Sequence, residues 1–373
     1  MAHVADRWTT PGPSGRRVRT DRYGTGMRWQ AVWHEPDGTR RRRSFTTKDA
    51  AQAHLEHVGV SQRSGTYVPP DRGRITVAEM ADRWLAEQVH QRATSLDVAR
   101  RRLTNTILPT LGGYALADVD RGVVQRAVTA WSRDLAPTTV RVAYVYLAGV
   151  FSLAVEERRI VASPCRRINL PPVDREPVIP LTVAQVQELV DRLWTPYRRM
   201  AVLAAATGMR SGELRGLTWD RVAIAPDGAS AQVRVDRQLV GGSAAAPAWG
   251  PLKTTSSRRV ISIGKATVDD LGEPGEGLVV RGARGGAVNR ERASEAWRHA
   301  ARPMGLSVRS GWHELRHFHA SLLISQGLSP VAVAHRLGHK DATETLRTYG
   351  HLWPDDDERM RDATDGVVRL PLG

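Results

Sequence analysis

The second half of the sequence holds the side-chain types that a phosphoryl-transfer site requires. A pentavalent phosphate needs fixed positive donors on its non-bridging oxygens. The reaction also needs a nucleophile, and an acid for the leaving oxygen. The candidates, in chain order, are Arg210, Lys253, His313, Arg316, His339 and Tyr349.

Arg210 lies between two glycines, at the end of an apolar stretch that is typical of a helix. The glycines, Gly208 and Gly212, predict a close approach of neighbouring backbone. Glu213 follows three residues after Arg210, a spacing at which its carboxylate can orient the guanidinium. The alternative is an ordinary surface ion pair, worth a few tenths of a kcal/mol.

Lys253 is one of only four lysines among 54 basic residues. A lysine can give up a proton, whereas an arginine in a protein cannot. The segment 251–261 predicts a β-hairpin with Lys253 near its turn. The alternative is a solvated loop with scattered charge.

The pentapeptide His313-Glu314-Leu315-Arg316-His317 admits two interpretations. As H-E-x-x-H it matches the zinc-protease signature, in which two His lie one helical turn apart. As H-x-x-R-H it places His313 and Arg316 on one helix face. The other histidines do not follow at the spacing of an extended zinc motif, so we favour the second interpretation. A purely structural helix is the third possibility.

Tyr349 follows ten residues after His339, which lies in the sequence Leu337-Gly338-His339. A tyrosine on a late helix usually serves core or interface packing. Its phenol, with a pKa near 10, is a weak nucleophile unless cations surround it. The arginines upstream could supply those cations.

Each of these signals is weak alone, but their order and spacing resemble the active site of the tyrosine recombinases, the lambda-type integrases in particular. The likeness extends to the residues between them: A-T-G-M-R-S-G-E-L-R-G-L-T-W at 206–219, L-K-T-x-x-S-x-R-x-I at 252–261 and H-E-L-R-H-x-H-A-S-L-L at 313–323. It is close over about 176–360, holds by pattern over 75–170, and is general over 1–66.

The resemblance implies a role for each residue. Arg210 and Arg316 would hold the scissile phosphate, assisted by His339. Tyr349 would attack it, leaving a 3′-phosphotyrosine and a free 5′-hydroxyl. The remaining roles are leaving-group acid for Lys253, general acid/base for His313 and support of the site for Glu213. The retained bond energy would allow rejoining without ATP, and neither a cofactor nor a metal is expected.

Composition and charge agree with a nucleic-acid partner. The chain of 373 residues has a net charge of +15, which favours a polyanion. Residues 1–74 carry 14 basic and 7 acidic side chains, including four consecutive arginines at 40–43. One face of that predicted strand could meet DNA, or the arginines could guard a solvated edge. A single cysteine, Cys165, argues against a disulfide framework.

We expect a multidomain protein with two linkers rich in proline or glycine. Residues 1–68 predict a small β-sheet plus a helix at about 49–58, an arm-type DNA-binding domain by resemblance. Residues 74–172 predict an all-α helical core-binding (SAM-like) domain, whose helices should cover about 77–85, 96–107, 116–131 and 138–157. Residues 176–373 predict a mixed α+β catalytic domain with a C-terminal tail, beginning with a helix capped by Thr182. Its strands are expected at about 232–239, 258–263 and 278–280.

The resemblance also implies partners and location. The expected substrates are double-stranded DNA attachment sites, core and arm, of a phage or conjugative element. A homotetramer would exchange strands through a Holliday junction, with accessory directionality and DNA-bending proteins. The tail from His351 onward could pack against a neighbouring protomer. No apolar run reaches the roughly 18 residues of a membrane span, and we expect a cytoplasmic, nucleoid-associated protein.

Three other functions remain possible on the sequence. A type IB topoisomerase shares the nucleophile chemistry but acts on one duplex as a monomer. A chromosome-dimer resolvase shares the catalytic domain but generally lacks the added N-terminal domain. A non-catalytic DNA-binding protein would keep the charge, but it gives no reason for Tyr349 to accompany the five partner residues.

Overall fold

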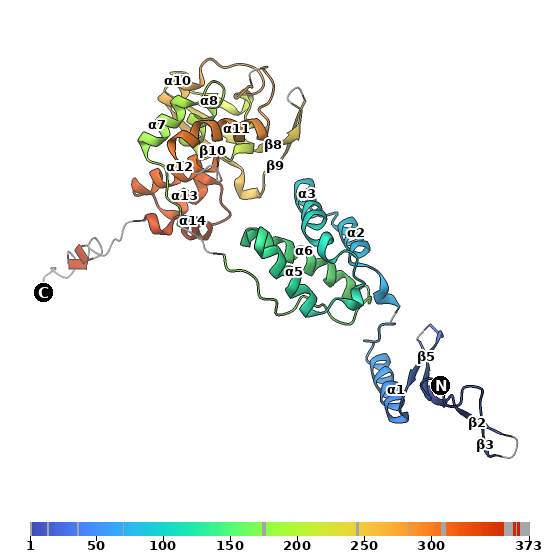
Figure 1. The fold of residues 1–373 in the computed structure, drawn as a ribbon. Coiled ribbons are helices and arrows are strands. Elements are labelled where there is room, and N and C mark those ends of the chain that lie inside the picture. Colours follow the sequence, from blue (N-terminus) through green and yellow to red (C-terminus); the bar gives the residue numbers. More distant parts are fainter. Residues whose placement is uncertain are drawn as a thin grey trace. The chain divides into compact units, whose positions relative to one another are not determined.

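The computed structural model describes residues 2–12, 15–35, 37–69, 71–173, 177–243, 246–282, 284–306, 311–353, 361–362 and 364–365. The chain divides into two compact units, Met1–Asp174 and Arg175–Gly373 (Figure 1). Most of the tail after Trp353 lies outside the described residues, so its packing on a neighbour stays a prediction.

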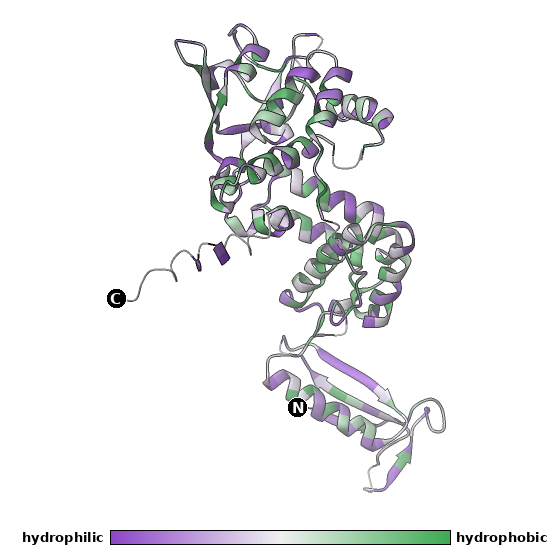
Figure 2. Cartoon of the chain, turned by 90° about the vertical axis from the view of Figure 1, so that its left-hand side faces the viewer, coloured by the Kyte–Doolittle hydropathy of each residue, from purple (hydrophilic) through white to green (hydrophobic). Residues whose placement is uncertain are grey.

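The first part of the N-terminal unit is a small antiparallel sheet covered by one helix. Its elements are β1 (His3–Asp6), β2 (Thr9–Pro11), β3 (Arg17–Arg19), β4 (Trp29–His34), β5 (Arg40–Phe45) and α1 (Lys48–Arg63). The sheet order is β1-β4-β5, and β2 and β3 form a separate two-stranded hairpin. Ala31 and Trp33 of β4 pack against Leu55 of α1. The four arginines make β5 a strongly hydrophilic strand (Figure 2).

Thr47 caps α1 by accepting a hydrogen bond from the backbone of Ala50, as an N-cap threonine should. The helix is longer than the predicted 49–58, because its exposed polar residues carry no periodic signal. The hairpin of β2 and β3 was not predicted from the sequence. Its strands are three residues each and mostly exposed, so they lack the apolar alternation of a half-buried strand.

The rest of this unit is a helical group. Its elements are α2 (Val77–Glu87), α3 (Ala93–Arg102), a π-helical turn η2 (Leu103–Ile107), α4 (Leu108–Leu111), α5 (Arg121–Asp134) and α6 (Pro137–Glu156), with short 3₁₀ turns η1 (Arg72–Arg74) and η3 (Leu116–Asp118). The capping box of Thr76 and Glu79 begins α2. The long predicted helix at 96–107 continues through η2 into α4.

Helix α6 is long and apolar enough to cross a membrane by length and composition. One side of it is nevertheless buried among the other helices of the group, with Leu147, Val150 and Phe151 wholly inaccessible. We therefore assign α6 as the core helix of this group, as the sequence predicted.

The second unit is a mixed α/β fold. Its helices are α7 (Val183–Arg192), α8 (Tyr197–Thr207), α9 (Ser211–Arg215), α10 (Lys265–Leu271), α11 (Arg290–Ala301), α12 (His313–Ser325), α13 (Pro330–Leu337) and α14 (Ala342–Tyr349). Its strands are β6 (Val222–Ile224), β7 (Ser230–Val235), β8 (Arg237–Gly242), β9 (Pro247–Pro251) and β10 (Arg259–Gly264). The 3₁₀ turns are η4 (Trp219–Arg221), η5 (Thr255–Ser257), η6 (Arg302–Met304) and η7 (Gly350–Leu352).

The larger sheet of this unit has the order β10-β7-β6, and β8 and β9 form a second, two-stranded sheet; all pairs are antiparallel. Every second residue of β7 and β10 is buried, including Val233 and Ile261, because successive side chains point to opposite faces. That buried face and the apolar face of α8 belong to one core. Helix α12 packs on α8, which brings the arginine-bearing segments 207–213 and 313–317 together.

The predicted β-hairpin at 251–261 was wrong. Strand β9 pairs with β8, whereas β10 pairs with β7 in the other sheet. Lys253 therefore lies in the connection between two sheets. The predicted strand at 232–239 is interrupted at Asp236 and forms β7 and β8. The predicted strand at 278–280 contributes only an isolated bridge, from Leu278 to Thr218. Strand propensity is local, but the choice of partner depends on distant residues.

Candidate active site

Arg210 is placed by a sharp break between two helices. Helix α8 ends at Gly208, whose φ of 65° is left-handed and suits glycine. A Cβ there would come within 2.7 Å of the His319 ring and 2.8 Å of Leu337. The close approach predicted from the glycines is thus present. Arg210 follows in extended conformation as the N-cap of α9.

Glu213 holds Arg210 from two sides. Its carboxylate accepts the Arg210 backbone N–H at 3.0 Å and the Nη1 of the same residue at 3.2 Å. It also accepts Nη2 of Arg259 at 2.9 Å. Burial would raise the pKa of Glu213, but Arg259 and Arg210 lower it on balance. Because the Glu213 side chain is only 1% exposed, its ion pairs with Arg210 and Arg259 form a buried network. The alternative of an ordinary surface ion pair was wrong.

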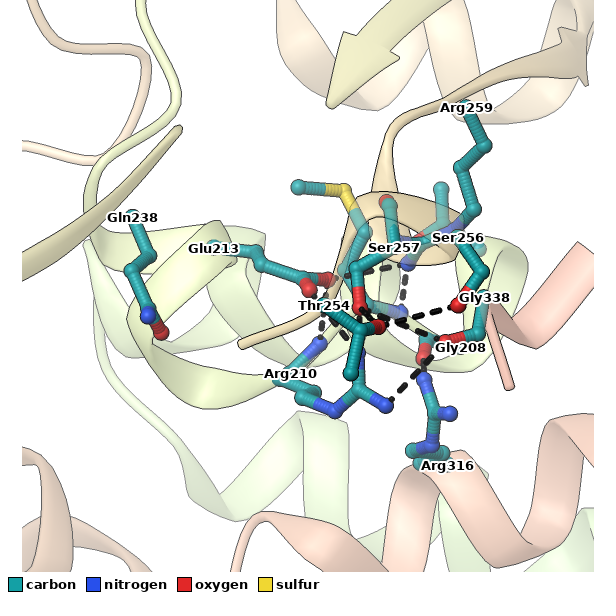
Figure 3. Close-up of polar contacts among 12 residues, drawn as sticks. Gly208, Arg210, Glu213, Gln238, Thr254, Ser256, Ser257, Arg259, Arg316 and Gly338 are labelled. Carbon is teal, nitrogen blue, oxygen red and sulfur yellow. Dashed lines mark hydrogen bonds and ion pairs between the residues drawn. The ribbon is translucent and has the colours of Figure 1, made fainter. Parts of the chain in front are cut away.

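The loops at 257 and 338 are tied to the same guanidinium (Figure 3). Arg210 donates to Ser257 Oγ and to the carbonyl of Gly338, both at 3.3 Å. Ser257 Oγ donates to the same carbonyl. Arg259 donates to the carbonyl of Arg336 at 2.9 Å. Two distant segments, around 257–259 and 336–338, are therefore fixed relative to Arg210.

Arg316 is the most unusual charge in this unit. It is 1% exposed, and its Nη1 donates to the carbonyl of Gly208 at 2.7 Å. Its Nη2 is buried without a hydrogen-bond partner. Burial lowers the pKa of Arg316, and the charges of Arg210 and Arg259 lower it further. A buried cation with an unused donor is costly unless an anion completes the site.

His339 directly follows the left-handed Gly338 that ends α13. Its Nδ1 shares a hydrogen bond of 2.7 Å with Thr345 Oγ1 of α14. Burial, followed by the charge of Arg316, lowers the pKa of His339 to about 4. The ring is therefore neutral at pH 7 and fixed in orientation.

Tyr349 is the last residue of α14 and is 1% exposed. Its hydroxyl shares a hydrogen bond of 2.8 Å with His317 Nδ1. Burial raises the pKa of Tyr349 to about 12, although Arg316 and Arg210 act in the opposite direction. The phenol is thus surrounded by the cations expected from the sequence, yet it stays protonated near neutral pH.

Lys253 and His313 lie nearer the surface. Both residues are exposed. The segment that carries Lys253 is tied to the site, because the adjacent Thr254 Oγ1 lies 2.9 Å from Ser257 Oγ. The rings of His313 and His317 meet edge-on at 4.6 Å. Desolvation of its ring and then nearby positive charges lower the pKa of His313.

The structure thus brings Arg210, Glu213, Arg316, His339 and Tyr349 together, with His313 beside them on α12. Three further residues were missed as functional candidates by the sequence interpretation: Ser257, Arg259 and His317. The signal for the first two was their place in the motif at 252–261. His317 was seen only as half of a zinc motif.

Comparison with known proteins identifies the family. Residues 180–355 match the model of the phage integrase family. The integrase of Mycobacterium phage L5 is 31% identical over 66% of this chain and 67% of its own length. This chain belongs to the phage integrase family and is a tyrosine-type site-specific recombinase.

Solved structures agree on the fold of the recombinase. The Tn1549 transposon integrase in complex with transposon right end DNA matches with a TM-score of 0.64 and 18% identity, over 77% of this chain and 98% of that one. A lambda integrase tetramer bound to a Holliday junction matches with a TM-score of 0.58 and 19% identity, over 84% and 94%. At these identities the likeness concerns the fold alone.

The zinc interpretation of 313–317 finds no support in the side-chain arrangement. Over the described part of the chain, no three His, Cys, Asp or Glu side chains are grouped to hold a metal. His317 Nδ1 is engaged by Tyr349. We predict that DNA cleavage by the recombinase survives treatment with EDTA, measured with metal content alongside. Stoichiometric zinc whose removal abolishes cleavage would contradict this prediction.

Proposed function

We propose that the recombinase integrates and excises a mobile element by cleaving and rejoining DNA through a 3′-phosphotyrosine at Tyr349. The observation that carries this proposal is the unpartnered Nη2 of Arg316 beside Arg210. A DNA phosphate supplies the anion that this buried cation lacks. An arginine pair can clamp the two non-bridging oxygens through parallel N–H groups.

In this mechanism each group has one task. Arg210 and Arg316 hold the scissile phosphate and stabilise the charge of the transition state. Glu213 keeps Arg210 in place, and His339 assists at the phosphate. Lys253 protonates the 5′-oxygen as it leaves, and His313 is the general acid/base. The Tyr349–phosphorus bond replaces the phosphorus–5′-oxygen bond, so the energy for rejoining is retained without ATP or a cofactor.

The proposed domain roles follow the chain. Residues 1–68 bind arm sites, residues 74–172 bind the core site, and residues 176–373 cleave. Four protomers exchange strands in two steps through a Holliday junction. The protein acts in the cytoplasm with accessory directionality and DNA-bending proteins.

The face of the N-terminal sheet that is free of α1 supports the arm-binding role. Alternate residues of a strand point to opposite faces. Arg41 and Arg43 are paired with the β4 residues that pack on α1, and Arg41 is engaged by Glu35 at 2.7 Å. Arg40 and Arg42 lie on the other face and are exposed. Arg43 is exposed as well, but it lies on the side of the sheet that carries α1, so Arg40 and Arg42 are the two arginines of β5 that face away from α1.

Removal of residues 1–68 tests this domain assignment. Gly73 must stay, because a Cβ there would lie 2.8 Å from Ala117, so η1 packs with the helical group. We predict that a protein beginning at Pro69 still cleaves core DNA but loses much of its affinity for arm sites. Each lost phosphate contact should reduce the slope of log K against log salt by about 0.9. An unchanged slope and footprint would contradict the role.

A supercoiled-plasmid assay tests the function as a whole. Plasmids carry none, one or both of the attachment sites found in the DNA that flanks the gene. The recombinase should give recombinant products only with two sites. Relaxation of a plasmid without sites would favour a type IB topoisomerase. Recombination only between two identical sites, which converts a plasmid dimer to monomers, would favour a resolvase. Binding without cleavage would indicate a non-catalytic DNA-binding protein.

A further inference from the structure

The hydrogen bond between His317 and Tyr349 has no role in the mechanism above. His317 Nδ1 lies 2.8 Å from Tyr349 Oη, and the two rings meet at 65° with centroids 5.5 Å apart. His317 follows Arg316 on α12, so one helical turn carries both the phosphate ligand and the partner of the tyrosine. No other side chain is shown bonded to this hydroxyl among the described residues.

We propose that His317 is the general base that takes the proton from Tyr349 as its oxygen attacks the scissile phosphate. The inference rests on the proposed function, in which Tyr349 is the nucleophile. The oxygen–hydrogen bond of Tyr349 breaks, its proton goes to His317 Nδ1, and the phosphorus–oxygen bond forms. The bond to the 5′-oxygen breaks and that oxygen takes a proton from Lys253. Rejoining reverses each transfer.

In the free protein the pKa values of the pair keep the proton on Tyr349 and leave His317 neutral. Burial raises the pKa of Tyr349 to about 12, so the phenol needs a base at neutral pH. Burial and then Arg316 lower the pKa of His317 to about 4, so its lone pair is free to accept. An opposite charge within about 4–6 Å shifts a pKa by roughly 1–3. A phosphate held by Arg316 would offset the charge that lowers the pKa of the adjacent His317, and so would raise its basicity when substrate is bound.

Because the Tyr349 hydroxyl bonds to His317, His313 remains available for another proton transfer. His313 touches His317 edge-on and lies at the exposed end of α12. The structure shows no hydrogen bond between His313 and Tyr349 among the contacts of the described residues. His317 is therefore the better placed of the two for deprotonating the nucleophile.

The test uses the full-length protein and a nicked suicide duplex that carries the core site from the DNA beside the gene. His317→Asn keeps an oxygen near the position of Nδ1, which can still accept a hydrogen bond but cannot take a proton. We expect covalent adduct to form about 100-fold more slowly at pH 7, the lower end of general-base effects. DNA binding should be unchanged. His299→Asn, at an exposed histidine of α11, is the matched control and should cleave at the wild-type rate.

Two readouts separate a base from a structural residue. Between pH 7 and 9 the ratio of His317→Asn to wild-type rates should rise about tenfold per pH unit, because attack then depends on the fraction of phenolate. This ratio cancels the titration of Lys253. The other charged groups facing the pair are His313 and Arg316 on α12, Glu314 and Glu344 near Tyr349, and Arg210. Added imidazole should restore the rate of His317→Gly at least tenfold.

The outcomes are distinct. A His317→Asn rate close to wild type, a flat pH ratio, or no response to imidazole would overturn the base assignment and leave His317 a residue that only orients the hydroxyl. Wild-type protein that forms no adduct on the duplex would instead overturn the proposed function, and this inference with it.

Discussion

Tyr349→Phe abolishes the covalent protein–DNA adduct while leaving DNA binding intact: this is the expected result with the largest effect. The substitution removes one oxygen and keeps the ring packed with Ala320, Ile324, Val333 and Leu337. It also removes one hydrogen bond to His317, a change of about 1 kcal/mol in stability. The fold should therefore survive, and the loss of adduct should be chemical.

Denaturing gels with labelled core-site DNA measure this result. Tyr197→Phe is the matched control, since it removes the hydroxyl of another buried tyrosine, in α8. That variant should form adduct at the wild-type rate. An adduct that persists in Tyr349→Phe would mean a different nucleophile, with Tyr197 or a serine the next candidates, and would remove the central residue of the proposed mechanism.

The order of site residues along the chain was the most informative feature of the sequence. Local rules also predicted the two helix starts at Thr76 and Thr182, where capping boxes form within four residues. The contact of Glu213 with the Arg210 guanidinium was predicted for the same reason, because the two residues lie three positions apart. Interactions of this range depend on few residues and can be found by pattern.

The parts of the site that escaped prediction depend on long-range contacts. Arg259 reaches Glu213 across 46 residues, and Arg210 reaches Gly338 across 128. No local pattern encodes these pairs. The same holds for the partner of His317, which lies 32 residues away. Burial of Arg316 is equally invisible, since an arginine in a helix is normally exposed.

For Lys253, the predicted secondary structure and the predicted chemical role have to be considered separately. Its predicted hairpin was wrong, because β9 and β10 belong to different sheets. The segment between β9 and β10 that carries Lys253 is nevertheless linked to Arg210 by hydrogen bonds, from Thr254 to Ser257 and from Arg210 to Ser257. The role inferred from the unusual choice of lysine in a chain with 54 basic residues therefore stays a prediction, and the contacts of its neighbours link its segment to Arg210.

Lys253→Arg is expected to keep DNA affinity but to lose cleavage by about 100-fold or more, the effect of losing a general acid. A guanidinium preserves the charge but holds its proton too tightly to donate it. Rates of adduct formation on core-site DNA measure the loss. Lys265→Arg is the matched control, because Lys265 pairs with Asp269 on the exposed side of α10 and should tolerate the exchange.

A modified substrate distinguishes a role of Lys253 as proton donor from a role of its positive charge. When sulfur replaces the 5′-bridging oxygen, the leaving group departs as a stable anion and needs no acid. This substrate should restore cleavage by Lys253→Arg to near the wild-type rate, while doing little for Tyr349→Phe, which lacks the nucleophile itself. If it fails to rescue Lys253→Arg, then Lys253 positions or stabilises charge, and the acid must be sought elsewhere. His313 is the next candidate, since it lies at the exposed end of α12 in the same helical turn as Arg316.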